Sequence, residues 1–394
     1  MTISITYTDE SSWLSGFPHD ECLNWTQLNL NRQAKQGLPS MSKGFNIPEK
    51  HDPIGFRWKS GDGATMKWYP QGITGTANAA NPRGSRFLVS SWYGKSEANY
   101  KQKGVRLSFV NYDSSSNDFC RYRHVLLVQN VQNINVQNPG LFCLDQTERN
   151  LYCQLNLYAP VPIHAGGIAW YKKYLYVVDT RVGIRVFDTT RMYPALADLP
   201  NKSKCGVDFN GDYYAFDYRY TLPQIGYYQT EGTEPNSFVS VGDNGRNPCL
   251  WVGQYITKGN TKLFGFVLNQ DGTIDTSATV EEFTPADENG PAYNMQGVYR
   301  SNGNTWMSVT GKSNYKNSTA RLITQAAGAN KGNRWRWPYG AEDLYLENDK
   351  GILWCQTEFP PNSRRLGSDR AVFGVNFASY APAKYITKQT GAAD

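Results

Sequence analysis

The stretch from His164 to Asp188 constrains the fold of this chain more than any other part of the sequence. It holds three short segments rich in β-branched and aromatic residues, at 166–171, 175–179 and 184–188, with turn-length connections between them. None of the segments reaches the roughly ten residues that a helix usually needs. Strands joined by tight turns form a β-meander, which is the building unit of a propeller blade.

Similar units recur along the chain. They begin near residues 68, 122, 218, 295 and 342, and weak repetition at about 40–55 residues is typical of a propeller. Three of the units begin with Gln71-Gly, Gly166-Gly and Gln296-Gly. Glycine is favoured on the inner strand of a blade, because the backbones of neighbouring blades are crowded at the axis. Because one meander cannot cover both faces of its own sheet, such units bury their faces against one another in a ring.

We therefore expect an all-β chain that forms a β-propeller. With the opening stretch, six blades are visible in the sequence, and a seventh could come from unassigned segments or from closure by the N-terminus. Residues 1–65 are irregular and are predicted to wrap or close the propeller. Residues 66–394 are predicted to form the propeller as a single domain.

Composition narrows the range of partners. Aromatic residues make up 14% of the chain, and an aromatic ring is a good platform for a sugar, although large β proteins are commonly rich in aromatic residues. The net charge of +6 is dispersed, which excludes a typical nucleic-acid protein and suits an anionic polysaccharide. No apolar run approaches 18 residues, so we expect no membrane span. We expect a monomer.

Cysteines and sequons bear on the compartment. The chain has seven cysteines, without C-x-x-C pairs or zinc-finger spacing, and Cys143 and Cys153 could close a hairpin loop with a disulfide. Asn24, Asn201 and Asn317 lie in N-glycosylation sequons. Residues 1–10 lack the apolar core of a signal peptide. We expect a secreted protein whose signal peptide is not part of this sequence.

Two histidines are candidates for chemistry. Among the four histidines, His124 and His164 flank predicted inner strands of neighbouring units, so they could converge at one end of a central channel. Tyr218 and Tyr220 fall on one face of a strand by period-two alternation. Arg246 lies in a turn of the same unit. For each of these residues a structural role is the alternative.

Several motifs together resemble the β-propeller polysaccharide lyases, namely the ulvan lyases and the fungal lyases that act on rhamnosyl-glucuronate. The resemblance covers residues 68–266 and, more loosely, the last two units. It is carried by Gln71-Gly, Ser91-Trp-Tyr, Tyr122-Arg-His-Val-Leu-Leu-Val, His164-Ala-Gly-Gly-Ile and Tyr218-Arg-Tyr-x-Leu-Pro. The most specific of these motifs are the two that contain the histidines.

The resemblance implies a seven-bladed propeller and β-elimination at a uronic acid. It places His124 and His164 on the family's two histidine positions, makes Tyr220 or Tyr218 the base, the acid or both, and makes Arg246 the partner of the substrate carboxylate. Such elimination needs a neutralised carboxylate, a base for the C5 hydrogen and an acid for the leaving oxygen. We also expect sugar contacts from a wider set of residues, namely Gln71, Trp92, Tyr93, Tyr218, Lys312, Asn314 and Tyr315.

The leading hypothesis is a secreted lyase that cleaves the bond to O4 of a glucuronic acid and releases L-rhamnose from arabinogalactan or gum arabic. Preference for this substrate depends on the sequons and on the cysteine-bearing insertion. An endo-acting ulvan lyase is the second hypothesis, and a non-catalytic propeller lectin is the third. No cofactor is required, although a structural calcium ion is compatible with the fold.

Overall fold

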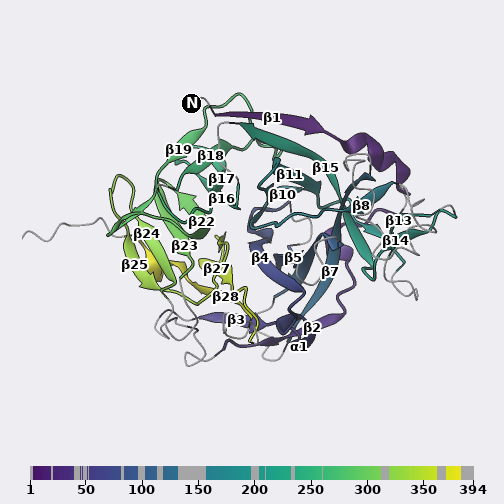
Figure 1. Ribbon diagram of the computed structural model, residues 1–394, viewed down its shortest axis with the longest axis horizontal. Coiled ribbons are helices and arrows are strands. Elements are labelled where there is room, and N and C mark those ends of the chain that lie inside the picture. Colours follow the sequence, from purple (N-terminus) through teal and green to yellow (C-terminus); the bar gives the residue numbers. More distant parts are fainter. Residues whose placement is uncertain are drawn as a thin grey trace, which may run out of the picture.

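Antiparallel sheets arranged around a central axis make up most of the protein (Figure 1). The computed structural model describes residues 3–18, 21–39, 45, 47, 51, 53–80, 84–95, 103–112, 119–131, 157–196, 204–208, 210–231, 236–259, 261–311, 319–361 and 370–382. No helix in these ranges is long and apolar enough to cross a membrane.

Five antiparallel sheets of four strands each are the blades of the ring. The first holds β4 (Trp68–Gly75), β5 (Phe87–Gly94), β6 (Val105–Asn111) and β7 (Phe119–Asn130). The second holds β9 (Ile168–Tyr171), β10 (Tyr174–Asp179), β11 (Gly183–Asp188) and β15 (Tyr220–Glu231). The third holds β16 (Phe238–Asp243), β17 (Pro248–Gly253), β18 (Leu263–Val267) and β19 (Glu281–Phe283). The fourth holds β22 (Met295–Ser301), β23 (Asn304–Val309), β24 (Arg321–Gln325) and β25 (Asn333–Arg336). The fifth holds β26 (Tyr345–Glu347), β27 (Ile352–Gln356), β28 (Ala371–Asn376) and β3 (Ile54–Arg57).

The innermost strand of each blade touches the innermost strands of its neighbours. At two glycines of the inner strands, an added Cβ atom would overlap the backbone of the next blade. A Cβ at Gly72 would overlap Ile168 of β9, and one at Gly297 would overlap Asp343, just before β26. Only glycine allows so close an approach. The contacts run from β4 through β9, β16, β22 and β26 and back to β4, so the ring is closed.

The all-β propeller class is confirmed, but the number of blades differs from the expected seven. The described residues form five blades, and their inner strands already close the ring. The segment 122–128, interpreted as a new unit, is part of β7, the outer strand of the first blade. The segment 218–225 leads into β15, the outer strand of the second blade, instead of opening the third. The expected number of blades was too high because β7 and β15 are outer strands of twelve residues. The sequence pattern of each resembles the first strand of another meander.

The N-terminal segment runs around the outside of the ring (Figure 1). Its first strand β1 (Ser4–Asp9) pairs with β15, and β2 (Arg32–Gln36) pairs with β7. Its third strand, β3, pairs with β28 and so completes the fifth blade, whose other strands come from the C-terminal part of the chain. The boundary of the propeller domain at residue 66 stays a prediction.

The remaining elements are short. They are α1 (Ser60–Gly63), β8 (Tyr158–Pro160), β12 (Tyr193–Pro194), β13 (Cys205–Val207), β14 (Tyr213–Ala215), β20 (Ala286–Asp287), β21 (Gly290–Pro291) and the 3₁₀ turns Ser11–Gly16, Trp25–Gln27, Thr76–Asn78 and Phe377–Tyr380. Described cysteines 22, 120, 205, 249 and 355 are free, and Cys143 and Cys153 lie outside the described residues.

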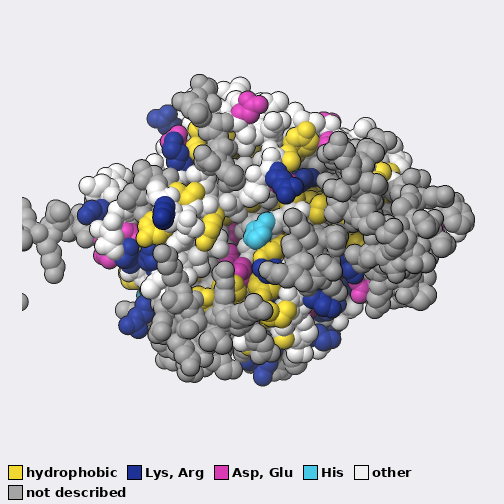
Figure 2. All heavy atoms as spheres, in the orientation of Figure 1, with side chains coloured by type: hydrophobic (Ala, Val, Ile, Leu, Met, Phe, Trp, Pro, Cys, Tyr) yellow, Lys and Arg dark blue, Asp and Glu magenta, His cyan; other side chains and the backbone are white. Residues whose placement is uncertain are grey.

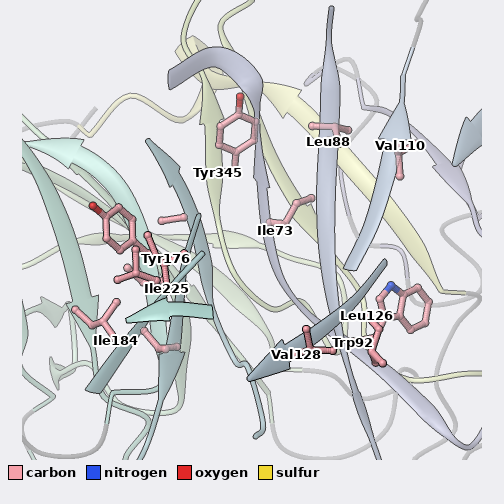
Figure 3. Packing of buried hydrophobic residues seen from close by; sticks show 14 of the residues in the cluster. Ile73, Leu88, Trp92, Val110, Leu126, Val128, Tyr176, Ile184, Ile225 and Tyr345 are labelled. Atoms are coloured by element: carbon pink, nitrogen blue, oxygen red, sulfur yellow. The ribbon is translucent and has the colours of Figure 1, made fainter. Parts of the chain in front are cut away.

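Apolar side chains fill the spaces between blades (Figure 3). Ile73 and Leu88 of the first blade, Tyr176 and Ile184 of the second and Tyr345 of the fifth belong to one buried cluster. Burying a large apolar side chain contributes about 1.5–3 kcal/mol, so this contact between blades is the main force that holds the ring together. Tyr345 adds a polar link, because its hydroxyl accepts a hydrogen bond of 2.9 Å from Ala77 N, just beyond β4.

Candidate functional site

His164 lies at the end of the propeller axis where the inner strands begin. It precedes β9, and nearby Gly166 packs directly on Ser237, the residue before β16. His164 is exposed, whereas the other described histidines, His51 and His124, are buried. Figure 2 shows a histidine near the middle of one face of the molecule, with acidic and hydrophobic side chains beside it. We call this end of the propeller the His164 end.

Hydrogen bonds define which nitrogen of His164 carries the proton. Its Nε2 lies 3.0 Å from Oε1 of Gln71, on β4. The amide nitrogen of Gln71 donates to the Glu358 carboxylate and, at 3.1 Å, to the carbonyl of Pro70. Because both of those partners only accept, Gln71 must present its oxygen to His164. The Nε2 of His164 is therefore a donor, and in the neutral ring Nδ1 is left as the basic nitrogen.

The imidazole is neutral at physiological pH. Desolvation by the surrounding protein is the larger cause and the charge of Lys95 the second, and together they lower the pKa of His164 to about 4. His164 is exposed at the surface, yet protein atoms surround its ring closely enough to disfavour the imidazolium. A neutral His164 can accept a proton at neutral pH.

Tyr93 and Lys95 stand next to this histidine. The ring centroids of Tyr93 and His164 are 4.0 Å apart, and the Lys95 ammonium donates a hydrogen bond of 2.9 Å to the Tyr93 hydroxyl. Lys95 also lies over the ring of Tyr69, 4.3 Å from its centroid. Tyr93 and Lys95 are half-buried, so this wall beside His164 can still be reached by solvent.

Behind this wall lies a buried arginine. Arg370 donates to the carbonyl of Glu358 at 2.6 Å, and its guanidinium lies 4.5 Å from the ring centroid of Tyr69. Burial lowers the pKa of Arg370 to about 9, so the side chain remains charged at pH 7. Its buried Nη2 has no hydrogen-bond partner among the described residues. The buried Arg370 charge lies beside Glu358, so the two opposite charges offset each other at the His164 end.

Asp343, just before β26 of the fifth blade, contacts three other blades at the axis. Its Oδ2 accepts backbone N–H groups from Ile73 of β4 at 3.4 Å and from Ile168 of β9 at 3.2 Å, while Gly297 of β22 packs on its backbone. Burial raises the pKa of Asp343 well above its usual range, although these backbone hydrogen bonds oppose the rise. Asp343 is fully buried, so we assign it a structural role.

His124 belongs to a separate, sealed cluster. Its ring lies 2.8 Å from Ser108 Oγ and 3.2 Å from Asp62, and it is 3% exposed. Asp62 also binds Arg106 at 3.0 Å and Arg32 at 3.1 Å. Burial first and the Arg106 charge second lower the pKa of His124 to about 3, so it is neutral. Burial alone would raise the pKa of Asp62, but its charged neighbours hold it well below its usual range.

Two residues expected to touch sugar are part of that same cluster. Trp92 is 0% exposed and donates from Nε1 to Ser108 Oγ at 2.8 Å. Tyr218 is buried with its ring 6.4 Å from that of His124. Alternation along β5 explains the error at Trp92, because Trp92 and Tyr93 point to opposite faces and only Tyr93 reaches His164. Trp92 and Tyr218 are therefore packing residues in this structure.

Tyr220 and Arg246 lie away from both the His164 end and the His124 cluster. Tyr220 starts the outer strand β15, is buried, and accepts a hydrogen bond of 3.4 Å from Asn29 N. Arg246 is exposed in the turn after β16, whereas His164 lies beside Ser237 at the start of that strand. The six residues of β16 span about 20 Å, which separates the two side chains. The expected grouping of two histidines, a tyrosine and an arginine does not form.

Of the expected residues, the structure brings together Gln71, Tyr93 and His164. Lys312, Asn314 and Tyr315 lie outside the described residues. In the part of the chain that is described, no group of three or more His, Cys, Asp or Glu side chains is placed to hold a metal ion. The structural calcium ion therefore has no residues assigned to it and stays a prediction.

Sequence reasoning missed Lys95, Glu358 and Arg370. Lys95 carried a usable signal, because it follows Tyr93 by two residues and alternation puts both on one face. Glu358 and Arg370 carried none. They flank the connection between β27 and β28, and only closure of the fifth blade onto the first brings them beside Gln71 and Tyr69.

Comparisons by sequence find no relatives: no protein-family model matches this chain, and neither does any curated protein. Solved structures show distant likeness. A GH43_1 enzyme from Xanthomonas citri, in complex with xylotriose, is 10% identical with a TM-score of 0.40, over 84% of this chain and 98% of that one. A gluconolactonase from Xanthomonas campestris is 9% identical with a TM-score of 0.30, over 91% of this chain and 98% of that one.

A Bacteroides thetaiotaomicron protein of unknown function is similarly distant, at 11% identity and a TM-score of 0.34, over 87% of this chain and 76% of that one. Likeness at this level carries no argument about activity. The description of the fold depends on the strand pairing given above.

Proposed function

We propose that this protein is a polysaccharide lyase that cleaves the bond to O4 of a glucuronic acid by β-elimination, and that the reaction takes place at the His164 end. The observation that supports the proposal is the contact of a neutral imidazole, a phenol and an ammonium group in His164, Tyr93 and Lys95. These are the kinds of group that elimination at a uronic acid needs.

The reaction assigns one role to each group. Lys95 offsets the substrate carboxylate as negative charge builds into it. Nδ1 of His164 takes the proton from C5, and the electron pair of the broken C–H bond forms the C4–C5 double bond. The C4–O4 bond breaks, and the Tyr93 hydroxyl gives its proton to the leaving oxygen. Each proton transfer typically contributes about 10²–10⁴-fold to the rate.

These assignments revise the residues expected from the resemblance and keep the chemistry. Tyr93 takes the role expected of Tyr220, and Lys95 takes the role expected of Arg246. His164 keeps its role, with Gln71 holding its tautomer so that Nδ1 is the basic nitrogen. The proposed substrate remains the rhamnosyl-glucuronate end of arabinogalactan or gum arabic, with L-rhamnose as the leaving sugar.

Hydrolysis at the same end is the second candidate. The Glu358 carboxylate contacts Gln71, and Glu342 contacts Gln296 at 3.3 Å, so carboxylates from neighbouring segments reach the region of the axis. Glycoside hydrolysis commonly uses a pair of carboxylates, one as acid and one as base or nucleophile. The two reactions leave different products, because only elimination creates a double bond.

The test is to incubate the protein with gum arabic and, separately, with ulvan, and to follow both the ultraviolet absorbance of the conjugated double bond and the release of sugar. Absorbance with free rhamnose supports the proposal. Absorbance with shortened ulvan chains supports the endo-acting alternative. Sugar release without absorbance supports hydrolysis, and binding without either product supports a lectin.

A further inference from the structure

A pocket of about 260 Å³ lies at the end of the second blade opposite His164. Its lining includes Lys173 from the turn after β9 and Asp188 from the end of β11. His164 precedes β9, so the length of that strand separates the two places. The N-terminal strand β1 contributes Tyr7 and Asp9, which makes the pocket a feature of the assembled ring.

Four tyrosine rings form a continuous row along this pocket. The centroid distances are 4.7 Å from Tyr7 to Tyr228, 6.5 Å from Tyr228 to Tyr176 and 6.5 Å from Tyr176 to Tyr174. Tyr176 donates its hydroxyl hydrogen to the Gly272 carbonyl, and the Tyr228 hydroxyl accepts from Ile274 N at 3.0 Å, so these two rings are fixed as the floor. Tyr7 is exposed and Tyr174 is half-buried, so both remain accessible to a ligand.

Charges of both signs line the rim. Lys173 Nζ lies 3.3 Å and Arg191 Nε 3.9 Å from the buried carboxylate of Asp188. Asp9 adds a second carboxylate and accepts a hydrogen bond of 2.9 Å from Ser11 N. The two cations and two carboxylates balance, so an ionic ligand would meet like charge along with opposite charge. A neutral ligand that carries many hydroxyl groups can use both donors and acceptors.

We propose that this pocket binds one ring of a neutral sugar, at a site separate from the His164 end. The apolar face of such a ring packs on the exposed tyrosines, and its hydroxyls bond to the rim. The volume lies below the range of about 300–1,000 Å³ typical of sites for drug-sized ligands, which suits a single ring instead of a chain segment. The pocket would hold a neutral sugar of a polysaccharide while its glucuronate reacts at the His164 end. Sugar binding in the pocket does not require the proposed lyase activity.

The test is saturation-transfer-difference NMR with D-galactose, L-arabinose, L-rhamnose and D-xylose, and with D-glucuronic acid as the charged comparison. We expect transfer to at least one neutral sugar that depends on the pocket residues, whereas transfer to glucuronic acid, the sugar acid proposed to bind at the His164 end, should not depend on them. Tyr174→Ala and Lys173→Ala should each weaken the neutral-sugar signal, with about a tenfold loss of affinity for Tyr174→Ala, which equals about 1.4 kcal/mol. Lys173 is largely solvated, so its variant tests the pocket even if the tyrosine variant folds poorly.

Two controls separate this site from the other. Lys172→Ala changes the neighbouring lysine, which does not line the pocket, and should leave binding unchanged. His164→Ala should also leave it unchanged, even if that variant has lost all activity. The proposal is overturned if none of the neutral sugars gives a signal, if the pocket variants weaken the glucuronic acid signal as much as the neutral one, or if the neutral signal survives both pocket variants or disappears with His164→Ala.

Discussion

At the scale of single residues, the surroundings of a side chain decide its functional role more than its residue type does. His124 and His164 lie in the two most specific motifs of the resemblance, and both are neutral at pH 7. His124 is enclosed with Asp62 and Ser108, so it has no access to a substrate. His164 is exposed beside Tyr93, and this exposure is the reason for assigning it a chemical role.

A pair of phenylalanine variants tests that assignment. Tyr93→Phe removes the hydroxyl that Lys95 contacts and should lower turnover on the rhamnosyl-glucuronate substrate by about 10²–10⁴-fold, because it removes one proton-transfer group. Tyr220→Phe removes a hydroxyl from a buried site far from His164 and should leave turnover nearly unchanged. Initial rates measured by absorbance, with thermal unfolding as a check of folding, compare the two. Equal losses would contradict the role of Tyr93.

The acid limb of the pH profile reports on His164. Because its pKa is about 4, the imidazole stays neutral as the pH falls through 6, where an ordinary histidine is already gaining a proton. Activity that depends on neutral His164 should therefore persist to about pH 5 and fall near pH 4. In Lys95→Met the limb should move to higher pH, because the positive charge that opposes protonation is gone. An unmoved limb in Lys95→Met would assign the acid limb to another group.

The Asp62 cluster should matter for stability. Asp62→Asn leaves Arg106 buried without its carboxylate, and breaking such a buried pair costs about 3–5 kcal/mol. Asp349→Asn is the matched control, since its pair with Lys350 is 3.9 Å long and fully at the surface, and its effect should stay within about 0.5 kcal/mol. Urea unfolding gives both values. Similar losses in the two variants would show that the cluster adds little.

At the scale of elements, closure of the ring depends on a strand from the other end of the chain. The fifth blade takes β26, β27 and β28 from the C-terminal part and β3 from the N-terminal part. Joining distant segments in one sheet prevents a blade edge from opening independently. The edge of β28, which β3 covers, would otherwise offer unpaired backbone groups.

Gly55 of β3 allows that pairing. It has a φ of +148°, and a Cβ there would overlap the Val372 carbonyl of β28. Gly55→Ala should therefore lower the free energy of unfolding by more than the roughly 1–3 kcal/mol expected from backbone strain alone. Gly37→Ala provides the comparison, because its φ is +91° and its surroundings are open. Chemical unfolding of both variants isolates the cost of crowding at the seam, and equal costs would argue against it.

At the scale of the whole molecule, the axis is held by polar contacts between blades as well as by apolar packing. Asp343 accepts N–H groups from two other blades, and burial raises its pKa well above its usual range. Its protonated form is therefore favoured in the folded protein. The stability this gives is complete below the pKa of the unfolded chain, about 3.9, and is lost as the pH rises toward the folded pKa.

Asp343→Asn should remove this dependence. The amide keeps an oxygen for the N–H groups of Ile73 and Ile168 but cannot ionise. The variant should gain stability relative to the parent protein as the pH rises from 5 to 8, and urea unfolding at both pH values measures the difference. A difference that does not grow with pH would mean that Asp343 is already ionised in the folded protein.

Much of this architecture could be predicted from local pattern. Short β-branched and aromatic runs with tight turns favour meanders, and glycines at the openings of several units correspond to inner strands packed backbone to backbone. The number of blades could not be predicted, because it depends on which distant strands pair. Strand β15 packs parallel to β7 and antiparallel to β11, and β3 joins β28 across most of the chain.

Local pattern encodes the tendency of a segment to be a strand and which of its residues share a face, because those properties depend on neighbours in the chain. Together with the resemblance, it singled out His164, Gln71 and Tyr93 as candidates. Partners across the sheet are chosen by packing and register over the whole molecule. For that reason only the folded ring showed that Glu358 and Arg370 lie beside Gln71 and Tyr69 at the His164 end, and that His124, Tyr220 and Arg246 lie elsewhere.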